Sequence, residues 1–228
     1  MSATVVLGPL TRLGQAVVAD RSATTVLAVA RHADDVPAVV AATGLDPDDV
    51  VDASAGALTD RVRTLGEGPV RLVVAALGPV HPADPSAGRG VDFDADLAAV
   101  HRDLAYVDEV LGCGREVEVV LISSVIALAP GADRRYYGGW KCLVEDLLDQ
   151  RVRRHGGTLA VLYPGRLRPA RGGRPWHRLH ASYDGLARLA VAPELAPRAR
   201  RAVGADSRIW LVVRSISFAL RSLGLSKG

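Results

Sequence analysis

The chain has 228 residues and a formal net charge of +3, and 49% of its residues are hydrophobic. This length is enough to bury a full core as one domain, and so mild a charge gives no indication of nucleic-acid binding, so we expect none. With only two Phe and one Met, the core must be built from Val, Leu and Ala, which suits a parallel sheet covered by helices.

The start of the chain and its cysteines indicate where the protein works. Met1–Thr4 lack the basic stretch and long apolar run of a secretory signal, so we expect a cytoplasmic location. Cys113 and Cys142 have no second thiol or His at metal-ligand spacing, so we expect neither a disulfide scaffold nor a metal site.

Apolar runs of strand length alternate with helical stretches along the chain. The predicted strands are Thr4–Leu7, Thr25–Ala30, Val70–Ala75, Val117–Ile122 and Thr158–Leu162. The predicted helices, with apolar residues three and four apart, are Leu13–Ala19, Leu58–Leu65, Asp94–Leu111 and Tyr137–Val152. This alternation predicts a Rossmann-type, doubly wound parallel sheet between two layers of helices, forming one α/β domain over residues 1–228.

Loops are predicted where Pro and Gly cluster, at Gly78–Gly90, Ala129–Ala132 and Pro164–Pro175. In open α/β sheets ligands bind beyond the carboxyl ends of the strands. The residues that follow predicted strands are therefore expected to gather there: Gly8, Gly78, Ser124 and Pro164.

The first of these loops, Leu7 to Gly14, follows a strand and opens a helix. Glycine lets backbone N–H groups approach a phosphate closely, and a helix N-terminus favours negative charge. The loop therefore predicts a dinucleotide pyrophosphate site made by Gly8, Thr11, Arg12, Leu13 and Gly14. A tight turn that needs two glycines for packing alone is the simpler alternative.

Arg31 ends the second predicted strand, where the first βα unit meets the adenosine ribose. An acidic residue there favours NAD through the ribose 2′-hydroxyl, whereas Arg accommodates the 2′-phosphate of NADP. NADP(H) is therefore the predicted cofactor in preference to NAD(H). The alternative is a solvated Arg at the end of a strand.

The most specific pattern is Ser124 at a strand end, followed by Tyr137 and Lys141. Four residues apart on a helix, Tyr137 and Lys141 share one face. A carbonyl that accepts hydride needs a proton, and free tyrosine, with a pKa of about 10, supplies or takes one poorly at neutral pH. A nearby Lys cation lowers that pKa, and a Ser hydroxyl holds the carbonyl oxygen within reach.

In order and spacing, these three residues resemble the triad of the short-chain dehydrogenase/reductase family. The resemblance extends from about Thr4 to Gly165 and implies that Tyr137 is the general acid in reduction. It also implies that Lys141 binds the nicotinamide ribose. The first loop resembles the family's G-x-x-x-G-x-G turn, with Arg12 in place of the middle glycine.

Other family positions are matched less closely. Ala75-Ala76-Leu77-Gly78 replaces the family's Asn-Asn-Ala-Gly, so Ala75, Ala76 and Gly78 are expected beside the cofactor. By the same resemblance, Asp52 is expected near the adenine, and Pro164 and Gly165 form the turn over the nicotinamide.

Asp96 aligns with the family's helical Asn, which holds a proton-relay water. A carboxylate there could hold the water or act as a catalytic base. It could also be an exposed acid on a helix that has lost the relay.

Beyond these motifs, residues 166–208 are predicted to form a variable substrate-binding segment. Nine Arg lie between Arg166 and Arg201 against only Asp184 and Glu194. Guanidinium groups match phosphate and carboxylate, so an anionic or carrier-bound substrate is indicated, although a solvated basic loop is equally compatible.

The apolar stretch Ile209–Leu225 is interrupted by Arg214 and Arg221, and is too short and too charged to span a bilayer comfortably. We expect a final strand or helix packed at a subunit interface. An interfacial membrane contact is the alternative.

The resemblance implies an NADP(H)-dependent oxidoreductase that interconverts a ketone and a secondary alcohol, in bacterial specialised metabolism. It implies a homodimer or homotetramer formed through the helices Asp94–Leu111 and Tyr137–Val152. The alternative is a redox-neutral enzyme of the same fold, such as a dehydratase, epimerase or cyclase. A cofactor-sensing or structural protein is disfavoured, because Tyr137 and Lys141 are both retained.

Overall fold

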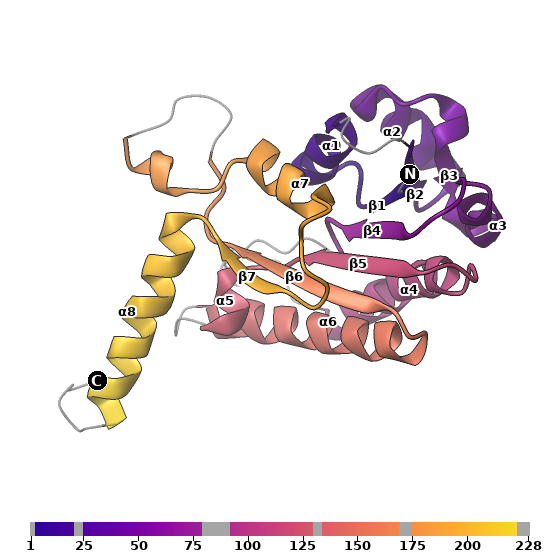
Figure 1. Ribbon diagram of the computed structural model, residues 1–228. Coiled ribbons are helices and arrows are strands. Elements are labelled where there is room, and N and C mark those ends of the chain that lie inside the picture. The colour runs from indigo at the N-terminus through magenta and orange to yellow at the C-terminus, as the bar shows by residue number, and fades with distance from the viewer. Residues whose placement is uncertain (1–2, 21–24, 79–91, 130–133, 169–174, 223–228) are drawn as a thin grey trace.

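The computed structural model describes residues 3–20, 25–78, 92–129, 134–168 and 175–222, and Figure 1 shows their arrangement. Seven parallel strands form one sheet in the order β3-β2-β1-β4-β5-β6-β7. Their bounds are β1 Ala3–Leu7, β2 Thr25–Ala30, β3 Val50–Asp52, β4 Val70–Val74, β5 Val117–Ile122, β6 Thr158–Pro164 and β7 Arg200–Val203. The strand order reverses between β1 and β4, which is where ligands bind in sheets of this kind.

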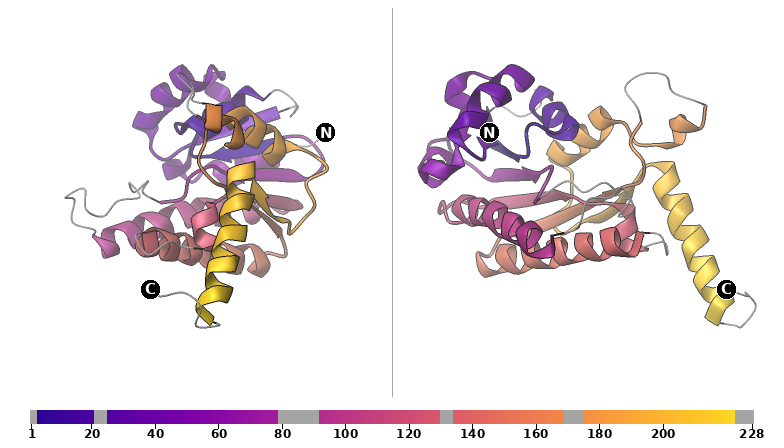
Figure 2. Two further views of the ribbon diagram at one scale, coloured as in Figure 1. Left: turned by 90° about the vertical axis from the view of Figure 1, so that its left-hand side faces the viewer. Right: turned by 180° about the vertical axis from the view of Figure 1, so that it is seen from behind.

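Helices cover both faces of the sheet (Figures 1 and 2). The helices are α1 Arg12–Ala19, α2 Val36–Thr43, α3 Leu58–Arg63, α4 Phe93–Leu111, α5 Val125–Leu128, α6 Arg135–Arg154, α7 Tyr183–Val191 and α8 Ala205–Ser222. Buried side chains of α3, α4 and α6 pack in one core cluster, and those of α1 and α7 pack in another. The predicted three-layer Rossmann fold is confirmed.

The strands alternate their side chains between these two cores. In β1, for example, Val5 and Leu7 join the cluster of α4 and α6, while Val6 joins that of α1 and α7. Because both faces of the strand are covered, it can carry apolar residues in succession. This is why so aliphatic a composition folds as a parallel sheet.

The five predicted strands and four predicted helices are present, with ends that differ by at most a few residues. The elements β3, β7, α2, α5 and α7 are not among the predictions. The predicted loops at 79–90, 130–132 and 169–174 lie outside the described residues. The C-terminal apolar stretch is helical over its described part and forms α8.

Helix α8 extends away from the sheet (Figure 2). Its base is held by the Ser207 hydroxyl, which donates to the Val203 carbonyl at 2.7 Å, and by the Trp210 ring N–H, which donates to the Ala129 carbonyl at 3.0 Å. Farther along it, Val212 and Ile216 are exposed. The described helices include none long and apolar enough to cross a membrane.

Gly14 fixes how tightly α1 packs on the turn that precedes it. A Cβ atom at Gly14 would lie 2.2 Å from the Gly8 carbonyl oxygen and 2.8 Å from the Pro9 Cα. Both neighbours are backbone atoms, so neither can turn aside, and only a residue without a side chain allows this packing.

We therefore expect Gly14→Ala to lower the free energy of unfolding by about 1–3 kcal/mol, because it overpacks the turn. Gly139→Ala is the matched control, since Gly139 lies in helix α6 with no atom near its added Cβ. That control should raise stability by up to about 1 kcal/mol through helix propensity. Urea denaturation of both variants measures the difference, and a stable Gly14→Ala protein would contradict the packing argument.

Candidate functional site

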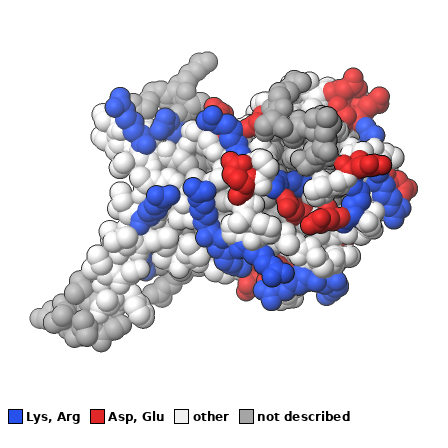
Figure 3. Space-filling model, viewed as in Figure 1, with Lys and Arg blue, Asp and Glu red and all other residues white. Residues whose placement is uncertain are grey.

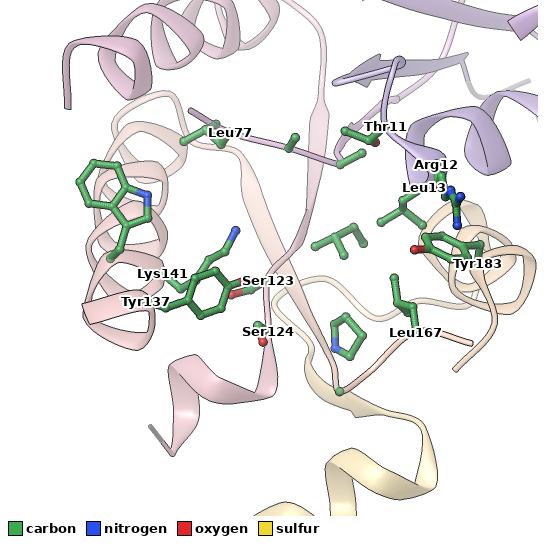
Figure 4. Close-up of a pocket in the computed structure, with 16 residues that line it drawn as sticks. Thr11, Arg12, Leu13, Leu77, Ser123, Ser124, Tyr137, Lys141, Leu167 and Tyr183 are labelled. Carbon is green, nitrogen blue, oxygen red and sulfur yellow. The ribbon is translucent and has the colours of Figure 1, made fainter. Parts of the chain in front are cut away.

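Two cavities open at the carboxyl ends of the central strands. The larger, of about 360 Å³, is lined by Thr11, Arg12, Leu13, Ala75, Ala76, Leu77, Ile122, Ser123, Ser124, Tyr137, Trp140, Lys141, Pro164, Gly165, Leu167 and Tyr183 (Figure 4). The smaller, of about 140 Å³, is lined by Gly8, Pro9, Leu10, Thr11, Val29, Ala30, Arg31, Asp35, Val39, Ala76 and Gly78. Because Thr11 and Ala76 line both, an elongated ligand can extend from one cavity into the other.

The first βα turn lies between these cavities. The Thr11 hydroxyl donates to the Gly8 carbonyl at 2.8 Å and accepts the Gly14 N–H at 3.0 Å, so it caps α1. Within the described part of the chain, the N–H groups of Arg12 and Leu13 have no protein acceptor. Two free amides at a helix N-terminus bind an anion readily. Thr11 therefore shapes the turn, while Arg12 and Leu13 offer the donors.

The backbone is exposed to a ligand here because small residues line it. Gly8 has a φ of +88° and lies so close to the end of β4 that an added Cβ would be 2.9 Å from the Ala76 nitrogen. The Ala75 N–H donates to the Leu7 carbonyl at 2.9 Å, which continues the pairing of β4 with β1. The predicted cofactor positions Gly8, Ala75 and Ala76 thus lie together, and their geometry fits a dinucleotide laid across the switch point.

Arg31 lines the smaller cavity, but its guanidinium already has a partner. Its Nε and Nη2 atoms donate to the two Asp103 carboxylate oxygens at 2.8 and 2.6 Å. The side chain of Arg31 is 41% exposed and that of Asp103 only 3%. The sequence predicts Arg31 as a group available to a 2′-phosphate, whereas the structure shows it paired with a buried acid from α4.

Asp103 also steadies the loop after β4. The Gly78 N–H donates to its carboxylate at 2.7 Å. Gly78 itself has a φ of +68°, and a Cβ there would lie 2.5 Å from a Val100 methyl group. The side-chain amides that Ala75 and Ala76 lack are therefore not needed to fix this loop, because a carboxylate on α4 fixes it instead.

Three predicted residues, Gly14, Asp52 and Asp96, line neither cavity. The Gly14 N–H is bonded to the Thr11 hydroxyl. The Asp52 carboxylate accepts the Ser54 N–H and hydroxyl at 2.9 and 2.7 Å, and so caps the turn that follows β3. Asp96 lies near the start of α4. Burial and, after it, the charge of Asp96 raise the pKa of Tyr136. The adenine contact of Asp52 and the relay or base role of Asp96 therefore stay predictions.

The structure does bring Ser124, Tyr137 and Lys141 together. Ser124 follows β5 and caps α5, accepting the Ile126 N–H at 3.4 Å, and its hydroxyl hydrogen-bonds to Tyr137. The Lys141 Nζ lies 5.7 Å from the centroid of the Tyr137 ring. Figure 4 shows all three side chains on one wall of the larger cavity, opposite Thr11, Arg12 and Leu13.

Burial dominates the electrostatics of this wall. It raises the pKa of Tyr137, against the hydrogen bond with Ser124 and the charge of Arg134. It lowers the pKa of Lys141, against the charge of Glu145. The expectation that Lys141 brings the pKa of Tyr137 below its ordinary value is therefore not met, because desolvation of the phenol is the larger effect. At neutral pH Tyr137 carries its proton and can donate it.

A buried carboxylate lies behind the triad. Glu145, one helical turn after Lys141, accepts hydrogen bonds from the Ser123 hydroxyl and from the Tyr163 hydroxyl, the latter at 2.8 Å. Burial, followed by the contact with Glu145, raises the pKa of Tyr163. These bonds tie the ends of β5 and β6 to α6. The sequence held a signal for this group: an acid four residues after Lys141, on the helix face that packs on the sheet.

Pro164 and Gly165 also line the larger cavity, and its walls are completed by residues that were not predicted: Leu77, Ile122, Ser123, Trp140, Leu167 and Tyr183. The approach of Trp140, Leu167 and Tyr183 depends on how α6, α7 and the loops fold. The described residues contain no group of three or more His, Cys, Asp or Glu side chains placed to hold a metal.

Comparison with solved structures supports the fold. A short-chain dehydrogenase from Burkholderia cenocepacia J2315, solved in complex with NADP, superposes with a TM-score of 0.64 at 12% identity over 99% of this chain and 98% of that one. The chain has the short-chain dehydrogenase/reductase fold. A short-chain dehydrogenase from Streptomyces avermitilis matches with a TM-score of 0.63 at 20% identity, over 97% of this chain and 95% of that one.

A third structure with this fold, described as a putative betaketoacyl-ACP reductase, has a TM-score of 0.59 at 18% identity over 90% of this chain and 96% of its own. No protein-family model and no curated protein sequence matches the chain. The likeness is therefore one of fold, and the roles of individual residues depend on the geometry above.

The contribution of the Asp103 contacts to stability can be measured. Asp103→Asn keeps the shape of the side chain but removes the charge that holds Arg31. We expect the free energy of unfolding to fall by about 1–3 kcal/mol, toward the lower end because Arg31 is partly solvated. Asp94→Asn, at an exposed acid of the same helix, should change it by no more than about 1 kcal/mol. Equal stability of Asp103→Asn and the wild type in urea would show that the pair does not hold the loop.

Proposed function

We propose that this protein is an NADP(H)-dependent oxidoreductase that interconverts a ketone and a secondary alcohol. The observation that carries the proposal is the convergence of Ser124, Tyr137 and Lys141 on a cavity that adjoins the first βα turn. A proton donor, a carbonyl-binding hydroxyl and a cation thus line the same cavity as the turn that would hold a dinucleotide.

Different residues around the point where the strand order reverses would bind different parts of such a cofactor. The free amides of Arg12 and Leu13 would hold the pyrophosphate, and Pro164 and Gly165 would bound the nicotinamide. Arg31 is the only cation among the described residues that line the smaller cavity, so it would meet the ribose 2′-phosphate, and part of its charge is already offset by Asp103. NADP rather than NAD is supported by Arg31 and by the NADP bound in the Burkholderia structure.

When bound, the cofactor supplies or accepts the hydride. The protein supplies the rest of the chemistry. The Ser124 hydroxyl donates a hydrogen bond to the substrate carbonyl oxygen, and Tyr137 transfers its proton to that oxygen as negative charge develops there. Lys141 would stabilise the tyrosinate that results and would hold the nicotinamide ribose. Apolar walls from Leu77 and Leu167 exclude water from the reacting carbon.

The substrate belongs to the class of anionic or carrier-bound ketones. Arg12 lines the cavity, and the segment 166–208, which we assign to substrate binding, is rich in Arg. A carrier-bound substrate is supported by the fold neighbour described as a betaketoacyl-ACP reductase. Arg168 does not contribute to binding this substrate charge, because its guanidinium donates to the carbonyls of His177 and Arg178 at 3.2 and 3.4 Å. Arg171 and Arg174 lie outside the described residues.

We extend the proposal to the protein's location, metabolic role and assembly. We assign the protein to the cytoplasm and to bacterial specialised metabolism, as one domain over residues 1–228. We assign it a homodimer or homotetramer formed through α4 and α6. A redox-neutral dehydratase, epimerase or cyclase is the second candidate, because Ala75 and Ala76 provide no amide side chains and Asp96 lies outside the cavity.

The cofactor assignment is tested by calorimetric titration of NADPH and NADH into the wild type, Arg31→Ala and Arg12→Ala. We expect NADPH to bind more tightly than NADH, and Arg31→Ala to weaken NADPH alone by about tenfold, because a charge-assisted contact to the 2′-phosphate is lost. Arg12→Ala should weaken both nucleotides, because it keeps the backbone amide but removes the guanidinium charge beside the pyrophosphate. If neither nucleotide binds the wild type, the oxidoreductase proposal fails.

The chemistry is tested by NADPH oxidation with a panel of β-ketoacyl thioesters and phosphorylated ketones. Tyr137→Phe should reduce turnover by about 10²–10⁴-fold while cofactor binding persists, because only the proton donor is removed. Tyr136→Phe, at the exposed neighbouring ring, should retain turnover. Conversion of a substrate without net NADPH consumption would identify the redox-neutral alternative.

The pH dependence has a definite sign. Reduction needs protonated Tyr137 and charged Lys141, and burial raises the first pKa and lowers the second. We therefore expect the rate of ketone reduction to fall on the alkaline side as Lys141 loses its proton, below the ordinary Lys pKa. Glu145→Gln removes the charge that favours the Lys141 cation and should move this alkaline limb to lower pH. An unchanged pH profile in Glu145→Gln would contradict the electrostatic assignment.

A further inference from the structure

A separate cavity lies at the opposite end of β6, between the last turns of α6 and the start of β7. It has a volume of about 360 Å³ and is lined by Asp149, Val152, Arg153, Gly157, Leu159, Arg198 and Arg200. None of these residues lines the two cavities of the candidate active site. Leu159 lies near the amino end of β6, whereas the candidate active site follows its carboxyl end.

The lining of this cavity is strongly basic. It contains three Arg and one acid, Asp149, whose carboxylate lies 2.5 Å from a guanidinium nitrogen of Arg153. Arg198 forms no ion pair among the described residues. Figure 3 shows basic side chains gathered over the face where β7 and the end of α6 lie. The cavity thus has more positive charge than its own acid offsets.

One of the guanidinium groups is oriented by the surrounding structure. An Arg200 Nη atom donates to the Tyr163 hydroxyl at 3.0 Å and lies 3.6 Å from the Glu145 carboxylate. Arg153, whose side chain is 77% exposed, forms an ion pair with Asp149 one turn earlier on α6. A side chain that is already oriented, as Arg200 is, loses less conformational freedom when a ligand binds.

Arg198 occupies a backbone position that rarely suits a side chain. Its φ is 65°, and it is the only residue other than glycine with positive φ among those described. It lies in a turn closed by the Ala199 N–H, which donates to the Ala196 carbonyl at 3.1 Å, with Pro197 before it. Glycine or Asn fits such a position at lower cost. Because an Arg at this position has a cost in backbone strain, its presence beside the cavity indicates a functional role for its side chain.

We propose that this cavity is an anion-binding site that takes the phosphate group of a small metabolite. Guanidinium groups bind phosphate through paired hydrogen bonds, and three of them line one hollow here. The volume is that of a small-molecule site. The proposal does not depend on the oxidoreductase function, because the two sites share no lining residue.

The test is a titration of the full-length protein with pyrophosphate at constant ionic strength, followed by amide chemical shifts in two-dimensional NMR spectra. We expect saturable shifts at Ala199, Arg200 and Arg153, resolved from any shifts at the Arg12 and Leu13 amides. Arg198→Gly, which removes the guanidinium and suits the positive φ, should weaken this binding by about tenfold or more. Arg153→Ala should weaken it as well.

Arg154→Ala is the matched control, since Arg154 neighbours Arg153 on α6 and does not line the cavity. It should leave the affinity within about twofold of the wild type, as a surface charge outside a site contributes little. Shifts confined to the α1 turn, an equal response to chloride, or an equal loss in Arg154→Ala and Arg198→Gly would overturn the proposal. Thermal unfolding of each variant establishes that it is folded.

Discussion

The close approach of the first βα turn to the end of β4 is the constraint on which the rest of the structure depends. Gly8 and Gly14 allow the backbone of this turn to lie against itself and against Ala76, at distances that no side chain would permit. Because β1 and β4 are the two strands between which the sheet order reverses, this contact forms the floor shared by both cavities. It also leaves the amides at the start of α1 open to a ligand.

Buried carboxylates on α4 and α6, helices on one face of the sheet, hold the loops and strand ends around the cavities. Asp103 on α4 holds Gly78 and Arg31, and Glu145 on α6 holds Ser123 and Tyr163. Each carboxylate is largely removed from water, so its hydrogen bonds are strong and its loss would leave several groups without partners. The loop after β4 is thus held by the Asp103 carboxylate, since Ala75 and Ala76 have no side-chain amides to hold it.

Helix α6 carries charged residues that line or support both the candidate active site and the distal basic cavity. Lys141, Glu145, Asp149 and Arg153 follow one another at intervals of four residues, so each lies beside the next along the helix. The first lines the candidate active site, the second supports it, and the last two line the distal basic cavity. A single row of charges therefore connects two regions whose linings are otherwise distinct.

The sequence by itself determined the fold class and indicated Ser124, Tyr137 and Lys141 as the candidate catalytic residues. Alternating apolar strands and amphipathic helices permit few arrangements other than a parallel sheet with helices on both faces, and the spacing of Tyr137 and Lys141 on one helix is a local property. What the sequence could not determine depends on distant contacts: the pairing of Arg31 with Asp103, the burial that raises the pKa of Tyr137, and the exclusion of Asp52 and Asp96 from the cavities. The walls formed by Leu167 and Tyr183 and the basic cavity beside β7 belong to the same group. Periodicity and spacing record which neighbours a residue has along the chain, whereas burial and charge pairing are set by residues tens of positions away, and only the tertiary structure brings those together.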